Sequence, residues 1–136
     1  MADMLYGLEG LNLTPQELNK VIYHRQNLVN PYIMDGNPVT IYATGIKVPE
    51  GKYKGQFVSV PGYVGGKVVE SEDELWKLWK KDIEAGKWPI YKSSKELNAR
   101  DSWLHQVMDK DIQSWMKTQK PYEKFDSLFW EDSPLR

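Results

Sequence analysis

The sequence predicts one α+β domain, in which a small antiparallel β-meander packs with about three amphipathic helices. Three helix-start patterns, each followed by apolar residues at helical spacing, predict the helices. Between the first and second patterns lies a stretch rich in β-branched and aromatic residues and broken by glycine and proline turns, which predicts short strands. The connections are too short for parallel crossovers, so we expect antiparallel pairing.

Each predicted helix begins with a hydroxyl residue followed three residues later by glutamate, the pattern of a capping box. The first start also carries a proline at the first helical position. Proline or glycine marks each expected end. The starts are at Thr14 with Glu17, Ser71 with Glu74, and Ser93 with Glu96, and the ends are near Asn30, Gly86 and Gln119.

Turn-forming residues divide the predicted meander into strands. We expect strands at residues 39–48 and 56–60 and a short third one at 68–69, with the tight turn between Gly65 and Gly66 forming a hairpin or bulge. Gly65-Gly66-Lys67 is not a phosphate-binding loop, because that motif needs an earlier glycine in register and Ser or Thr after the lysine. We therefore divide the chain into an N-terminal apolar arm (1–13), the domain (14–120) and a C-terminal aromatic, acidic tail (121–136).

Composition narrows the classes of function. The chain has 136 residues, no cysteine, and a formal net charge of −1. Disulfides and thiolate chemistry are therefore excluded, and nucleic acid is not expected as the main partner, because such proteins usually carry a basic excess. We see neither a leader-like N-terminus nor a membrane span, and expect synthesis in a reducing cytoplasm. The aromatic content, with six tryptophans and eight tyrosines, predicts a core that needs no cofactor or metal.

Two histidines are candidates for chemistry. His24 lies off the apolar stripe of the first helix, which predicts a solvated side chain. His105 shares a helical face with Asp101 and Asp109, a spacing that can present ligands to a divalent cation. We nevertheless expect these three residues to form a polar face with weak pairing and no metal site, since three ligands on one straight helix usually need support from elsewhere.

Asp111 falls within the apolar arc of the third predicted helix, and Arg100 projects into the same arc two to three turns earlier. A carboxylate on an apolar face is unfavourable unless it is paired or hydrogen-bonded. We therefore expect both residues to be buried structural polar groups. The partner of Asp111 is left open between the β-meander backbone, a basic residue such as Arg25 or Arg100, and a subunit contact.

The tail combines aromatic and aliphatic side chains with acidic residues and bounding prolines. Such a segment must dock, either on its own domain or on another protein, where aromatic anchors dominate binding energy. We expect a partner-binding segment made of Tyr122, Phe125, Leu128, Phe129 and Trp130.

Two resemblances bear on function. Gly51, Lys54 and Gly55 resemble the turn of the KOW motif, which in ribosomal and transcription-elongation proteins sits on a small SH3-like barrel. Residues 30–32, 45–48, 57–67 and 88–91, including Val60-Pro61-Gly62-Tyr63 and a glycine turn, resemble small uncharacterised proteins encoded in the structural gene clusters of tailed bacteriophages.

The phage resemblance implies a non-enzymatic virion component of a head, neck, tail or internal assembly, made in the host cytoplasm and bound to other virion proteins or to copies of itself. Apolar arms and the lack of a recognisable active site agree with it. The first alternative is an accessory binding module with an SH3-like element that contacts nucleic acid or a host protein. A metal-assisted hydrolase built on Asp101, His105 and Asp109 comes third.

Overall fold

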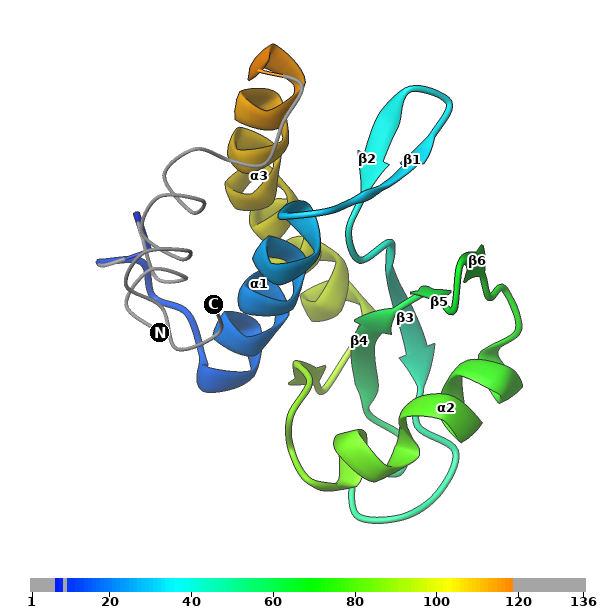
Figure 1. Ribbon diagram of the computed structural model, residues 1–136. Helices are drawn as coiled ribbons and strands as arrows, with labels where there is room; N and C mark the ends of the chain where they lie inside the picture. Colours follow the sequence, from blue (N-terminus) through cyan, green and yellow to red (C-terminus); the bar gives the residue numbers. More distant parts are fainter. Residues whose placement is uncertain (1–6, 9, 119–136) are drawn as a thin grey trace.

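The computed structural model describes residues 7, 8 and 10–118 of the chain. It shows the predicted α+β fold, with helices on both faces of short antiparallel strands (Figure 1). In chain order the elements are α1 (Pro15–Leu28), β1 (Tyr32–Met34), β2 (Asn37–Val39), β3 (Ala43–Lys47), β4 (Phe57–Pro61), β5 (Tyr63–Val64), β6 (Lys67–Val68), α2 (Glu72–Glu84), β7 (Ile90–Tyr91) and α3 (Ser94–Thr118).

The central sheet has three strands in the order β3-β4-β7, all antiparallel. Ile46 lies opposite Val58, and Gly45 lies opposite Ser59. Because side chains alternate along a strand, these two pairs face opposite sides of the sheet.

The two sides of this sheet are covered by different helices. Ser59 bonds to Lys20 of α1 and to Asp101 of α3, so these two helices cover its side. A Cβ on Gly45 would lie 2.9 Å from the Leu97 side chain of α3, which confirms this placement. α2 packs on the other side, where Ile46 and Val58 are buried (Figure 1).

All three predicted helix starts are confirmed. The Thr14 hydroxyl accepts from the Glu17 N–H at 3.1 Å, and the Glu17 carboxylate accepts from the Thr14 N–H at 3.0 Å, which completes the capping box of α1. Ser71 and Ser93 accept from the N–H of Glu74 and Glu96 in the same way. Gly86 follows α2 with φ of +72° and donates to the Ile83 carbonyl, as expected of a glycine stop.

The core is aliphatic and aromatic, as the composition indicates. Tyr23, Trp79 and Trp88 pack edge to face, with ring centroids 5.4–6.3 Å apart. The buried apolar residues come from every layer and include Val21, Ile46, Val58, Val60, Leu75, Trp76, Ile83, Leu104 and Met108. No helix among the described residues is long and apolar enough to cross a membrane.

The strands differ in detail from the predicted meander. The expected strand 39–48 is broken at Tyr42, whose φ of +51° is incompatible with an extended strand, and the strands divide into three small sheets within the described region. The β1–β2 hairpin and β7 are additions that the sequence pattern did not predict. The turn at Gly65 and Gly66 is confirmed, since both have the positive φ that a two-residue hairpin loop requires.

Two further expectations are corrected. Leu8, in the predicted N-terminal arm, is 6 % exposed and belongs to the hydrophobic core, so this part of the arm packs on its own domain. The KOW-like residues Gly51, Lys54 and Gly55 lie in the β3–β4 connection. That hairpin belongs to a three-stranded sheet covered by helices, not to an SH3-like barrel.

Gly62 and Gly45 provide a matched test of this packing. A Cβ on Gly62 would lie 2.7 Å from the Tyr42 carbonyl oxygen, whereas a Cβ on Gly45 would meet only the movable end of Leu97. Chemical unfolding of Gly62→Ala should show a loss of about 2–3 kcal/mol, near the upper range for overpacking, and Gly45→Ala about 1 kcal/mol. Equal losses in the two variants would contradict the close approach at Gly62.

Candidate functional site

A row of buried polar side chains lines the contact between α1 and α3. Glu17, Lys20 and His24 are spaced three and four residues apart, so they share one face of α1. All three have no exposed surface. Their partners on α3 are Arg100, Asp101 and Asp111, and together with Arg25 these residues form what we call the polar seam.

Glu17 occupies the first position of the seam. Arg100 donates two hydrogen bonds to its carboxylate, at 2.6 and 2.8 Å, and the Tyr91 hydroxyl donates a third at 2.7 Å. Burial acts to raise the pKa of Glu17, but the bonds from Arg100, the Thr14 N–H and Tyr91 outweigh it and lower the pKa to about 2. The carboxylate therefore stays charged and cannot serve as a proton acceptor near neutral pH.

Lys20 occupies the second position. Its ammonium group donates to Asp101 at 2.6 Å and to the Ser59 hydroxyl at 2.9 Å, and Ser59 donates to the other oxygen of Asp101 at 3.1 Å. Burial lowers the pKa of Lys20, and the charge of Asp101 offsets part of this effect. The closed triangle of bonds joins α1, α3 and β4 at one point.

His24 occupies the third position. One ring nitrogen, Nδ1, lies 2.5 Å from the Thr40 hydroxyl, and the other, Nε2, lies 3.2 Å from Asp111. Arg25 donates to both oxygens of Asp111, at 2.9 and 3.3 Å. Nε2 is the nitrogen that can donate to the carboxylate, whereas Nδ1 faces a hydroxyl group that can both donate and accept.

The order hydroxyl, imidazole, carboxylate is also that of a hydrolase triad. Two features distinguish this arrangement from a hydrolase triad. Arg25 binds both oxygens of Asp111, and Thr40 is only 5 % exposed. The geometry fits a group of buried polar side chains that satisfy one another.

The structure settles several expectations about these residues. Asp111 is 3 % exposed and hydrogen-bonded, as its helical phase predicts. Of the partners considered for it, Arg25 is the one that binds it. Arg100 pairs with Glu17 and keeps 34 % of its side chain exposed, so it is half-buried and not fully buried. The expectation of a solvated His24 is wrong, because residues 38–43 and α3 cover the polar side of α1.

The three candidate metal ligands do not form a site. Both oxygens of Asp101 are bonded within the seam, and Asp109 is exposed with a 3.5 Å bond from Gln113. Desolvation and the nearby charge of Lys20 lower the pKa of His105. Among the described residues, no three His, Cys, Asp or Glu side chains gather closely enough to hold a metal ion.

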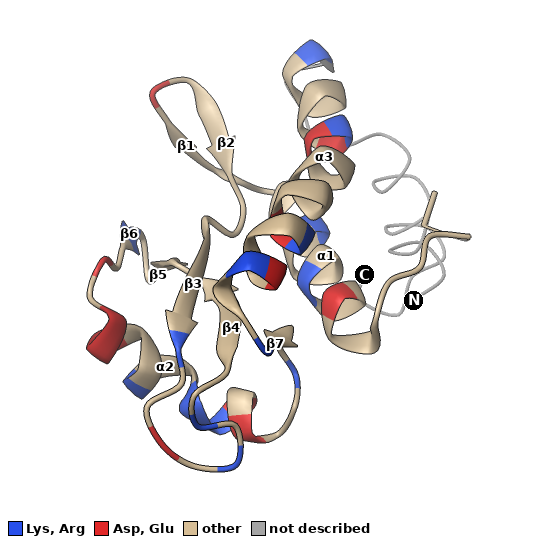
Figure 2. Cartoon of the chain, turned by 180° about the vertical axis from the view of Figure 1, so that it is seen from behind, with Lys and Arg blue, Asp and Glu red and all other residues tan. Residues whose placement is uncertain are grey.

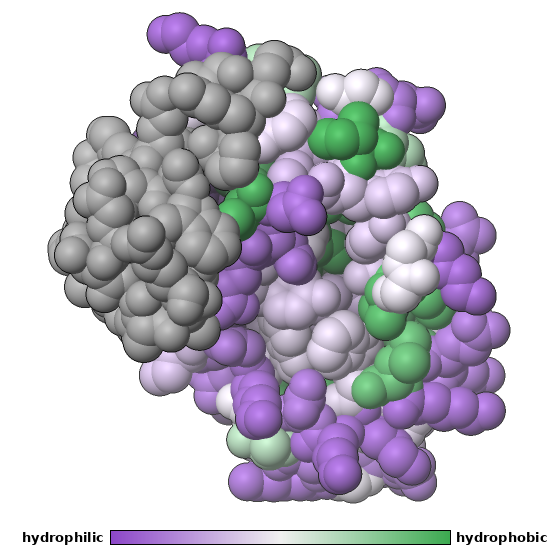
Figure 3. Space-filling model, in the orientation of Figure 1, coloured by the Kyte–Doolittle hydropathy of each residue, from purple (hydrophilic) through white to green (hydrophobic). Residues whose placement is uncertain are grey.

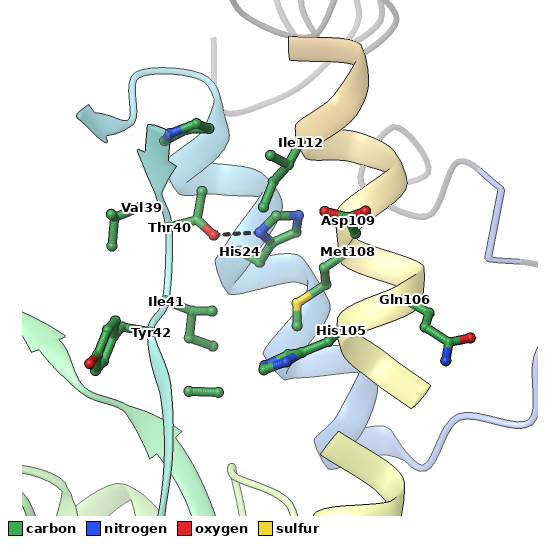
Figure 4. Close-up of a pocket in the computed structure, with 12 residues that line it drawn as sticks. His24, Val39, Thr40, Ile41, Tyr42, His105, Gln106, Met108, Asp109 and Ile112 are labelled. Carbon is green, nitrogen blue, oxygen red and sulfur yellow. Dashed lines mark hydrogen bonds between the residues drawn. The ribbon is translucent and has the colours of Figure 1, made fainter. Parts of the chain in front are cut away.

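A cavity of about 560 Å³ adjoins the third position of the seam, between α3 and the segment 38–43. In Figure 4, Met108 and Ile112 project from α3 towards Val39 and Ile41, and the bond between Thr40 and His24 closes the inner side. A second cavity of about 500 Å³ lies between α3 and β3 and shares Ala43 and His105 with the first. We call the two together the α3–β3 groove.

The surroundings of the groove expose large apolar side chains. Tyr42 lines the first cavity and is 51 % exposed, and its positive φ is held by bonds from Gly62 and Thr44 to its carbonyl. Tyr32 and Ile33 of the β1–β2 hairpin are 49 % and 44 % exposed, and the Tyr32 ring stacks on Tyr63. Figure 3 shows hydrophobic residues on the face that carries the β1–β2 hairpin.

Sequence reasoning missed most of this site. Lys20, Thr40 and Ser59 carry no local signal, because their partners lie 16–81 residues away in the sequence. The spacing of Glu17, Lys20 and His24 was the available clue, since it places three polar groups on one face. The predicted tail residues, Tyr122, Phe125, Leu128, Phe129 and Trp130, lie outside the described region.

Replacing Asp111 should be far more disruptive than replacing its neighbour on the same helix. Asp111→Ala leaves Arg25 and His24 buried without their carboxylate, which should lower the free energy of unfolding by about 3–5 kcal/mol. Asp109→Ala, at an exposed position, should change it by about 0.5 kcal/mol or less. Urea unfolding of both variants measures the difference, and a loss below 1 kcal/mol for Asp111→Ala would contradict the role of the seam.

The low pKa of Glu17 predicts acid sensitivity. Its ordinary value of 4.5 falls to about 2 in the folded state, so its contribution is complete above pH 4.5 and disappears as pH falls towards 2. The 2.5-unit difference corresponds to roughly 3 kcal/mol. Between pH 6 and pH 2, the free energy of unfolding should decline more steeply in the wild type than in Glu17→Gln, a substitution that keeps the capping box. Parallel declines in the two proteins would show that Glu17 does not cause the acid sensitivity.

Compared with known protein families, curated proteins and solved structures, the chain shows no significant match. Its function must therefore be inferred from its own residues and their arrangement. The features that carry such an inference are the polar seam, which is satisfied internally, and the α3–β3 groove beside it, which is open to solvent.

Proposed function

We propose that the protein is a non-enzymatic assembly component of a tailed-bacteriophage virion and acts through protein–protein contacts. The observation that carries this proposal is the α3–β3 groove with its exposed rim. Tyr42 lines the apolar cavity with 51 % of its surface exposed, and Tyr32 and Ile33 of the β1–β2 hairpin are 49 % and 44 % exposed; exposed apolar side chains of this size are typical of protein-binding sites.

The chemistry of the polar seam supports an assembly role over a catalytic one. A general acid or base needs a proton-transfer group that is accessible and has a pKa near the working pH. Glu17 instead remains ionised, and Lys20 and Asp101 neutralise each other in the interior. These contacts fix how α1 and α3 lie together, which is a structural task.

The binding-module alternative, with nucleic acid as partner, has less support. Basic and acidic residues alternate along α3, and the β1–β2 hairpin carries a single charged residue, Asp35 (Figure 2). The phosphate backbone of a nucleic acid requires a continuous basic surface, and neither α3 nor the β1–β2 hairpin offers one. Binding with a steep dependence on salt would nevertheless establish that alternative.

The phage assignment itself rests on the resemblance of residues 30–32, 45–48, 57–67 and 88–91 to proteins of phage structural gene clusters. In an infected host, the protein should be made in the cytoplasm and incorporated into particles. Mass spectrometry of purified particles tests this directly: peptides of this chain should co-purify at a stoichiometry comparable to that of known structural proteins. Their absence would overturn the virion assignment.

The tail provides a test of the assembly mechanism. Truncation after Gln119 removes Phe125, Leu128, Phe129 and Trp130, whose burial would contribute about 1.5–3 kcal/mol each. The truncated chain should keep its helical circular dichroism but lose self-association or partner binding in sedimentation experiments. Failure of the truncated chain to fold would instead assign the tail to the core of the domain.

A further inference from the structure

The outer edge of β3 runs along the α3–β3 groove. In the order β3-β4-β7, one edge of β3 pairs with β4, and no described strand pairs with the other. The Val48 N–H donates to Gln56 at 2.8 Å, and hydrogen-bonded pairs alternate along an antiparallel ladder. The backbone N–H and C=O groups of Ala43, Gly45 and Lys47 therefore point away from β4.

This edge has few of the features that normally protect a strand from pairing. Residues 43–47 contain no proline, and the only charged side chain is Lys47 at the end. Ala43, Gly45 and Lys47 also line the cavity between β3 and α3, where the Leu97 side chain lies against Gly45. An extended peptide in the groove would find backbone bonding groups on β3 and an apolar cavity at one end.

The most economical occupant is part of this protein. Residues 119–136 follow α3 directly, and Ile112 in the apolar cavity lies six residues before the end of α3, about 9 Å along the helix axis. The segment carries four aromatic residues and two leucines that need a docking site. Its 18 residues can span about 60 Å when extended, more than the roughly 37 Å length of α3, so it can reach a neighbouring molecule.

We propose that the α3–β3 groove receives the C-terminal segment of a second copy of the chain. Aromatic side chains from residues 122–130 enter the cavity beside Met108 and Ile112, and the adjoining backbone pairs with the edge of β3. This inference rests on the proposed assembly function. It names the partner, which is a second copy, and the site, and it states that the tail of one copy enters the groove of the next. Because groove and tail are different surfaces, the contact is heterologous and forms rings or chains of subunits.

Photo-crosslinking of the full chain tests the proposal. Tyr42→p-benzoylphenylalanine keeps an aromatic side chain at the rim, and Gln106→p-benzoylphenylalanine places a second probe on the α3 wall at an exposed position. Leu78→p-benzoylphenylalanine is the matched control, since Leu78 is also 51 % exposed but lies on α2. Mixing ¹⁴N- and ¹⁵N-labelled chains before irradiation distinguishes links between copies from links within one.

Both groove probes should yield cross-linked dimers at least about fivefold above the Leu78 control, with linked peptides from residues 119–136 that combine the two isotopes. Cross-links between a groove probe and the tail of the same chain would show that the occupant is not a second copy. Cross-links to residues outside 119–136, or a yield no higher than that of the control, would show that the groove does not receive the tail. The two proposals remain separable. If truncation after Gln119 abolishes assembly but neither probe links to the tail, the groove proposal alone is wrong.

Discussion

The contact between α1 and α3 depends on charged groups that are buried in pairs. Removing an ion from water is unfavourable by several kcal/mol, and a buried pair recovers this only when its remaining bonding groups are also satisfied. Glu17 meets this condition with Arg100, Tyr91 and the N-terminal backbone of its own helix. Lys20 meets it through Asp101 and Ser59. A shift of α3 by one turn would break all of these bonds together, so the seam fixes the register of the two helices.

The seam also ties the sheet to the helices. Ser59 of β4 and Tyr91 of β7 each contribute a hydroxyl to it, and Thr40, just before β3, contributes a third. Apolar packing alone tolerates sliding of one layer over another, because it has no directional requirement. Directional bonds to three separate parts of the chain remove that freedom. The sheet therefore takes a defined position against α1 and α3.

Local signals in the sequence predicted the helices well and the strands less well. The N-caps at Thr14 and Ser71 depend on residues three positions apart, so they can be predicted from a short stretch of sequence. The helical phase likewise placed Asp111 on a buried face. The break at Tyr42 depends on bonds from Gly62, twenty residues away, and no local pattern reports it. His24 was misassigned because its polar surroundings, Thr40 and Asp111, come from distant segments, and a window around His24 shows only the edge of an apolar stripe.

The seam and the groove meet at Thr40, and this junction shapes the groove. The Thr40 hydroxyl holds its segment to His24, which is held in turn to Asp111 on α3. The Asn27 amide donates to the Thr40 carbonyl at 2.8 Å and adds a second anchor from α1. Both walls of the groove are thus bonded to the same helix, so their separation is set before any ligand arrives. A preformed groove avoids the ordering cost that binding otherwise incurs, and that advantage suits the contact between copies that we propose.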